Sequence, residues 1–170
     1  MKKTLLIILM AVLLGSLAYM IIAMTNIQQK RETQEQSRQQ LPAANFTRLD
    51  GKTINLKELG AERKTMIIYF SPDCDHCQYE AKAIKAHIDQ FAGTVICMIT
   101  KATSSQAAEF AATYQLENEL IHIFTDHTGT FYEQFGMVSV PSIFIYDANG
   151  NLKKHFSGEV KIESLIKYIN

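Results

Sequence analysis

The chain has 170 residues and no formal net charge, because 17 Lys and Arg side chains balance 17 Asp and Glu side chains. This length fits one ordinary domain with a short appendage. The charge balance argues against a nucleic-acid-binding protein, which normally carries a large basic excess. Three cysteines are too few for a disulfide-stapled miniprotein, and a hydrophobic content of 47% is too high for a disordered chain.

The chain opens with an apolar segment. Thr4 to Met24 contain no charge, and 18 of these 21 residues are apolar. As a helix at about 1.5 Å per residue they span roughly 32 Å, close to the hydrocarbon thickness of a bilayer. Residues 1–24 are therefore predicted to be a transmembrane anchor. An N-terminal signal sequence is the alternative, with Ser16-Leu17-Ala18 as a cleavage site, although the apolar run continues past it. The basic start at Lys2-Lys3 favours an N-terminus inside the cytoplasm.

A polar stalk follows the anchor. Residues 25–40 hold six Gln and five charged residues and contain neither Gly nor Pro. These residues favour helix, so the anchor helix can continue through them; a disordered linker is the open alternative. Pro42 marks the expected end of the stalk. Residues 41–170 are long enough for one domain with its own core.

The domain is predicted to alternate strands and helices. Apolar runs and turn signals indicate strands at 45–49, 53–56, 66–70, 94–100, 120–125, 142–146 and 152–156. Helical spacing or capping residues indicate helices at 77–91, after 104–105, around 131–135 and at 160–169. This order indicates an α/β fold, with an N-terminal hairpin and a central mixed sheet flanked by helices.

The most informative motif is Cys74-Asp75-His76-Cys77, between a buried strand and a helix. Cysteines at this spacing can form a disulfide across one helical turn, and the positive helix N-terminus stabilises a thiolate at Cys74. We expect Cys74 to attack a substrate disulfide and Cys77 to resolve the mixed disulfide, which leaves a Cys74–Cys77 disulfide. Half of a zinc site and a structural disulfide are the alternatives. The sequence has no second C-x-x-C that would complete a zinc site. A structural disulfide that closes so short a loop would add little to the stability of the fold. We expect neither a metal nor a cofactor.

The domain resembles the thioredoxin-fold thiol–disulfide oxidoreductases, closest in plan to the membrane-anchored TlpA/ResA-like group. The resemblance runs from about Phe46 to Ile169 and includes the opening hairpin, the strand–CxxC–helix unit and the Val140-Pro141 segment. It implies a thioredoxin fold and a cis peptide bond before Pro141, facing the cysteines. It also implies that the backbone of Val140 pairs with a bound substrate strand.

The same resemblance implies a setting and partners. The domain would lie on the periplasmic or extracytoplasmic side of a bacterial cytoplasmic membrane, anchored in the lipid bilayer by residues 4–24. It would reduce disulfides in substrate proteins, such as apocytochromes during cytochrome c maturation. A membrane electron donor would re-reduce it, because the compartment is oxidising. No nucleic-acid partner is expected.

The dipeptide between the cysteines leaves the direction of electron flow open. His76 occupies the place of a histidine that favours the thiolate in strongly oxidising and isomerase-type relatives. The neighbouring carboxylates of Asp73, Asp75 and Glu80 act against it, because they raise the pKa of a thiol. A disulfide oxidase or isomerase is therefore the alternative to a reductase.

Two other functions are weaker hypotheses. Cys74 and Cys77 with His127 or His155 could form a soft Cu(I) site in a metal-delivery module. Ser71-x-x-Cys74 resembles a peroxiredoxin motif, but Ile67 stands where the expected proline would be. Cys97, inside a buried strand, is expected to be a core thiol rather than a second resolving or regulatory one.

Overall fold

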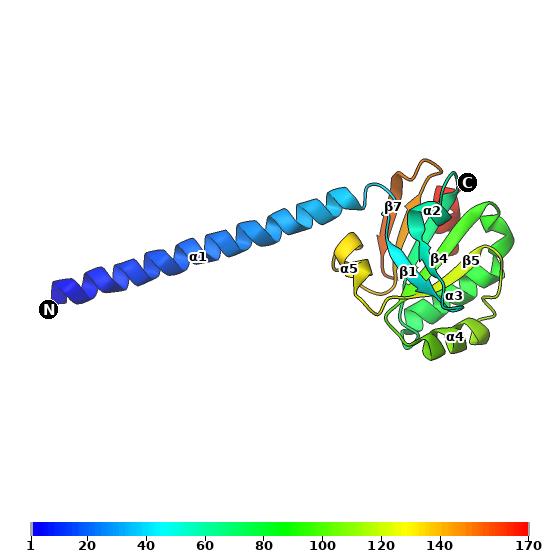
Figure 1. Cartoon of the computed structure of the whole chain (residues 1–170), viewed down its shortest axis with the longest axis horizontal. Helices are drawn as coiled ribbons and strands as arrows, with labels where there is room; N and C mark the ends of the chain where they lie inside the picture. Colours follow the sequence, from blue (N-terminus) through cyan, green and yellow to red (C-terminus); the bar gives the residue numbers. More distant parts are fainter. Residues whose placement is uncertain (1, 170) are drawn as a thin grey trace.

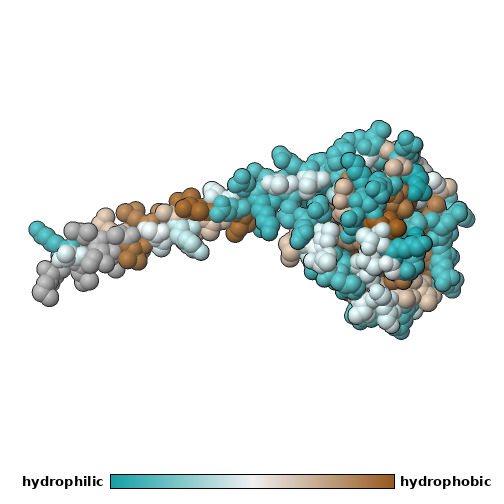
Figure 2. Space-filling view, viewed as in Figure 1, coloured by the Kyte–Doolittle hydropathy of each residue, from teal (hydrophilic) through white to brown (hydrophobic). Residues whose placement is uncertain are grey.

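The computed structural model describes residues 2–169, apart from the side chains of residues 2, 5–9 and 11. Helix α1 (Lys2–Ser37) projects from the domain as one continuous rod (Figure 1). The stalk is therefore helical to Ser37, and the disordered linker considered for residues 25–40 is not what forms. Within the described chain, Val12–Ser37 is long and apolar enough to cross a membrane, and its apolar stretch is not buried against the domain. Apolar side chains gather along the middle of α1, and hydrophilic ones lie nearer the domain (Figure 2).

The domain is built on one mixed sheet of seven strands in the order β2-β1-β5-β4-β3-β6-β7. Strands β3, β4 and β5 run parallel, and the other neighbours pair antiparallel. The strands are β1 (Asn45–Arg48), β2 (Thr53–Asn55), β3 (Lys64–Tyr69), β4 (Thr94–Thr100), β5 (Ile121–Thr125), β6 (Ser142–Tyr146) and β7 (Leu152–Ser157). The predicted fold class is confirmed, including the opening hairpin and the closing hairpin.

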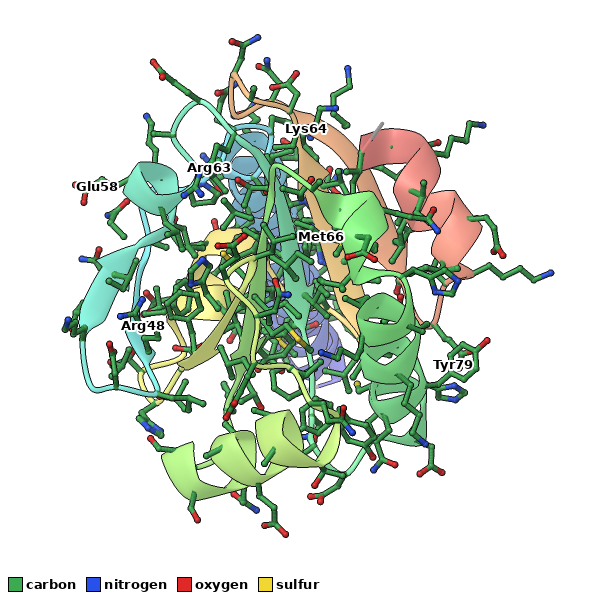
Figure 3. All side chains as sticks on the ribbon, turned by 90° about the vertical axis from the view of Figure 1, so that its right-hand side faces the viewer. Arg48, Glu58, Arg63, Lys64, Met66 and Tyr79 are labelled. Carbon is green, nitrogen blue, oxygen red and sulfur yellow. The ribbon has the colours of Figure 1, made fainter. Side chains whose placement is uncertain are left out.

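Helices cover both faces of this sheet. Alternate side chains of a strand point to opposite faces, so Met66 and Ile68 of β3 enter one core while Ile67 and Tyr69 enter the other. The first core lies under α3 (Asp75–Ala86), α4 (Ser104–Thr113) and α6 (Ile162–Ile169). The second lies under α2 (Leu56–Leu59) and α5 (Thr130–Phe135). Figure 3 shows Met66 in the middle of the sheet and Tyr79 projecting from α3 towards solvent.

Several helices differ in extent from the prediction, including α6, which begins at Ile162 rather than at residue 160. Helix α3 begins at Asp75 rather than Cys77 and ends at Ala86, and a separate 3₁₀ turn covers Ile88–Phe91. Helix α4 is capped by Thr103, which forms a reciprocal capping box with Gln106. The short α2 was not predicted, because four residues are too few to show a helical period.

Candidate active site

The CxxC motif forms the first turn of α3, directly after the carboxyl end of β3. The Phe70 N–H is still bonded to the sheet through the Ile99 oxygen at 3.0 Å. The chain then turns, and Cys74 adopts an extended backbone as the N-cap of α3 (φ −93°, ψ 116°). The Gln78 N–H donates to the Cys74 carbonyl at 3.0 Å, which closes the first helical turn. Cys74 thus lies where a helix exposes its unpaired N–H groups, and Cys77 lies one turn further in.

The three thiols differ in exposure. Cys74 is partly exposed, whereas Cys77 and Cys97 are 1% and 0% exposed; all three are free thiols in the structure. Burial raises the pKa of Cys77 to about 12, although a backbone hydrogen bond from Ser71 opposes this rise. The neighbouring Cys74 thiol and the Glu80 carboxylate raise it further. Burial in β4 likewise raises the pKa of Cys97 to about 12, consistent with a core thiol. The Cys74–Cys77 disulfide stays a prediction.

The Val140–Pro141 segment faces the first cysteine. The peptide bond between them is cis, as the resemblance implies. The Cys74 thiol lies 3.9 Å from the Val140 carbonyl oxygen (Sγ to O), and the Val140 side chain is 38% exposed. Ser139 is bonded to Ser157 through their hydroxyls at 2.7 Å. The structure therefore brings Cys74, Cys77 and the Val140–Pro141 segment together at one edge of the sheet.

Glu80 is a site residue whose position the sequence analysis missed, because it was treated as one of three exposed carboxylates. Asp73 and Asp75 are exposed, but Glu80 is only 1% exposed. One of its oxygens accepts a hydrogen bond from the Val160 N–H at 3.1 Å, and the other has no partner among the described residues. Burial raises its pKa to about 7, with a contribution from the Glu159 charge. The available signal was spacing, since position 80 lies on the same helix face as Cys77, Ala81 and Ile84.

His76 pairs with Glu159 in the loop between β7 and α6. Its Nδ1 lies 2.7 Å from the Glu159 Oε2, and its side chain is 69% exposed. The partners are 83 positions apart in the chain, so only the fold reveals the pair. An imidazolium at His76 would have its charge balanced by this carboxylate.

The residues considered for Cu(I) do not come together. Within residues 2–169, no group of three or more His, Cys, Asp or Glu side chains is arranged to hold a metal ion. His127 is exposed beyond the end of β5. His155 of β7 stacks on the ring of Phe144, with ring centroids 4.1 Å apart.

The sequence signature of the AhpC/TSA family matches residues 38–155, which is more than half of the chain. The chain belongs to the AhpC/TSA family. No curated protein matches it in sequence. Membership in this family and the thioredoxin-like fold confirm the predicted enzyme class, a thioredoxin-like thiol–disulfide oxidoreductase.

Solved structures share the fold at low sequence identity. A secreted disulfide oxidoreductase of Mycobacterium tuberculosis is 16% identical with a TM-score of 0.66, over 75% of this chain and 94% of that one. StoA from Bacillus subtilis is 18% identical with a TM-score of 0.58, over 76% and 100%. A variant of peroxiredoxin 6 from Arenicola marina is 10% identical with a TM-score of 0.65, over 78% and 70%. At these identities the likeness establishes the fold alone.

The burial of Glu80 predicts a pH-dependent stability. Its pKa rises from 4.5 to about 7 on folding, so the folded chain binds more protons between these values. The free energy of unfolding therefore falls as the pH rises through this window, by roughly 3 kcal/mol. The neutral variant Glu80→Gln lacks this contribution. The difference in free energy of unfolding, variant minus wild type, should therefore be roughly 3 kcal/mol larger at about pH 8 than at about pH 5.

Urea unfolding of the reduced proteins at these two pH values measures the effect. The control Asp75→Asn removes an exposed carboxylate and should keep the fall seen in the wild type. If the difference in free energy of unfolding between wild type and Glu80→Gln does not change with pH, the raised pKa of Glu80 is contradicted.

Proposed function

We propose that the chain is a membrane-anchored thiol–disulfide oxidoreductase of the TlpA/ResA-like kind, which reduces disulfides in extracytoplasmic proteins. The observation that carries this proposal is the contrast between two neighbouring thiols. Cys74 is partly exposed at the N-terminus of α3, and Cys77 is buried one turn further along. Such a pair suits an attacking and a resolving thiol, because the attacking group must be accessible as thiolate.

In the first step, the Cys74 thiolate attacks one sulfur of a substrate disulfide. A Cys74–substrate disulfide forms, the substrate S–S bond breaks, and the leaving sulfur takes a proton from solvent. The substrate segment lies against Val140, whose exposed position beside Cys74 leaves its backbone free to pair with an extended chain. This pairing fixes which sulfur approaches Cys74.

In the second step, Cys77 loses its proton and attacks the Cys74 sulfur. Glu80 accepts that proton, since its raised pKa, about 7, lets it take up a proton near neutral pH. The Cys74–Cys77 disulfide forms as the bond between Cys74 and the substrate breaks. The second substrate sulfur leaves as a thiolate and takes a proton from solvent. The substrate has gained two electrons, and a membrane-bound dithiol donor must return two electrons to the enzyme.

The pairing of His76 favours reduction over oxidation. A histidine at this place stabilises the Cys74 thiolate when its charge is uncompensated, which makes the disulfide a stronger oxidant. The Glu159 carboxylate, 2.7 Å from His76, balances that charge. We therefore expect a reduction potential near that of thioredoxin, about −270 mV, rather than near that of the strong oxidants, about −120 mV.

The long apolar helix supports the membrane assignment. A helix suited by length and composition to cross a bilayer is continuous with the stalk. The basic residues at its start favour an N-terminus inside the cytoplasm, with the catalytic domain outside it.

Trapping of a substrate tests the roles of the two cysteines. In Cys77→Ala the resolving thiol is absent, so a mixed disulfide between Cys74 and its substrate should accumulate and be recoverable by mass spectrometry from the membrane fraction. Cys74→Ala should trap nothing, and Cys97→Ala should behave as wild type because its thiol is buried away from the pair. A Cys77→Ala protein that captures no partner and cannot react with a model disulfide would contradict the proposal.

The direction of electron flow is tested by the charge on Glu159. Glu159→Gln leaves the His76 charge uncompensated and should raise the reduction potential by about 10–20 mV, the size expected for an exposed pair. In a His76→Gln background the same change should have no effect. A wild-type potential near about −120 mV would favour the oxidase or isomerase alternative. No shift in Glu159→Gln would contradict the effect given to the His76–Glu159 pair.

A further inference from the structure

The last turn of α1 is bound to the end of α5. Gln34 and Ser37 of α1 lie on the same side as Arg38, which follows the helix and whose N–H donates to the Gln34 oxygen at 3.2 Å. Gln34 Nε2 donates to the Tyr132 oxygen at 3.1 Å, and Arg38 Nη1 donates to the Phe135 oxygen at 3.0 Å. Ser37 Oγ lies 3.1 Å from the Gln134 oxygen and 2.9 Å from the Gln34 oxygen of its own helix, so its single proton is shared between them. Figure 1 shows α5 beside the domain end of α1. The stalk is therefore packed onto the domain at this point.

The oxygens of Gln134 and Phe135 belong to the carbonyl groups that a helix leaves unpaired at its C-terminus. The Tyr132 oxygen also accepts a hydrogen bond from the Gly136 N–H at 3.1 Å. Helix α5 has only six residues, too few to be stable without outside contacts. The approach is close: a Cβ at Gly136 would lie 3.3 Å from the side-chain oxygen of Gln34. Gly136 also has a positive φ of 81°, so the chain can turn sharply away from the stalk at this residue. The stalk thus caps α5 and fixes where the following loop begins.

The same end of α1 also holds strand β6. The Tyr146 hydroxyl donates to the Arg38 carbonyl at 3.0 Å, and the Arg38 guanidinium lies 5.9 Å from the centroid of the Phe144 ring. Beyond the helix, the Leu41 N–H donates to the Gly150 oxygen at 2.8 Å. Both Phe144 and Tyr146 are fully buried, so this attachment is to the rigid part of the domain.

Between α5 and β6 lies the loop of residues 136–141, which carries Val140 to within 3.9 Å of the Cys74 sulfur. The residues at the end of the stalk thus contact the helix that precedes this loop, and they contact Phe144 and Tyr146 in the strand that follows it. We propose that Gln34, Ser37 and Arg38 are positioning residues of the active site, which hold this loop where a substrate segment pairs with Val140. The inference rests on the proposed function and adds that the stalk helps to form the substrate site. None of the three residues touches substrate.

The test compares a substrate that uses the loop with one that does not. Full-length proteins in detergent are assayed with a short peptide that contains a disulfide, and with dithiobis(nitrobenzoate), a small disulfide that reaches Cys74 without backbone pairing. Gln34→Ala and Arg38→Ala should each raise KM for the peptide about fivefold, the factor expected for one lost hydrogen bond, with kcat within about twofold. Rates with the small disulfide should stay within about twofold.

Gln36→Ala is the matched control, because Gln36 is exposed on the same turn and its side chain makes no hydrogen bond among the described residues. It should leave both substrates unaffected. Amide hydrogen exchange of residues 136–141 provides a readout independent of turnover. Exchange should be faster in Gln34→Ala than in Gln36→Ala.

Three results would overturn the inference. An unchanged KM in Gln34→Ala and Arg38→Ala, with wild-type activity on the peptide, would show that the loop is positioned without the stalk. Equal losses with both disulfides would show general destabilisation instead of positioning. A wild-type protein inactive on both disulfides would remove the proposed function itself, and the inference with it.

Discussion

Cys77 and Glu80 lie one turn apart on the inner face of α3, under a first cysteine that reaches solvent. Burial opposes the charged form of both groups, and this shared desolvation distinguishes them from Cys74. A thiol with a pKa of about 12 is a poor nucleophile until it loses its proton, and a carboxylate with a pKa of about 7 is able to accept one. The proposed order of the two exchange steps, with Cys74 first and Cys77 second, rests on that difference.

The sheet provides this arrangement through its parallel strands. Strands β3 and β4 end at the same edge, where α3 begins with the cysteine pair. The antiparallel strand β6 begins at that edge directly after Pro141, so the loop that faces Cys74 has to enter there. The stalk then attaches to α5 and β6 from outside. The domain end of α1 thus lies against the helix and the strand between which the loop facing Cys74 runs.

The sequence predicts those features that depend on local patterns of residues. It does not predict contacts between residues that are far apart in the chain. Buried strands, both hairpins and the placement of the CxxC motif could be predicted from apolar runs and turn residues. The cis bond at Pro141 came from family resemblance. The burial of Glu80 depends on α6 packing beside α3, and the His76–Glu159 pair and the stalk contacts join residues about 80 to 110 positions apart. The periodicity of apolar residues within one helix or strand carries no information about contacts at such separations in sequence.

The most direct test of the account is the rate at which each thiol of the reduced protein is alkylated by iodoacetamide at about pH 8, followed by peptide mass spectrometry. With a pKa of about 12, Cys77 is almost entirely protonated at this pH, so Cys74 should react at least about 100-fold faster. Cys97 should become reactive only after unfolding, since its side chain is 0% exposed. Comparable rates for Cys74 and Cys77 would contradict the assignment of attacking and resolving thiols.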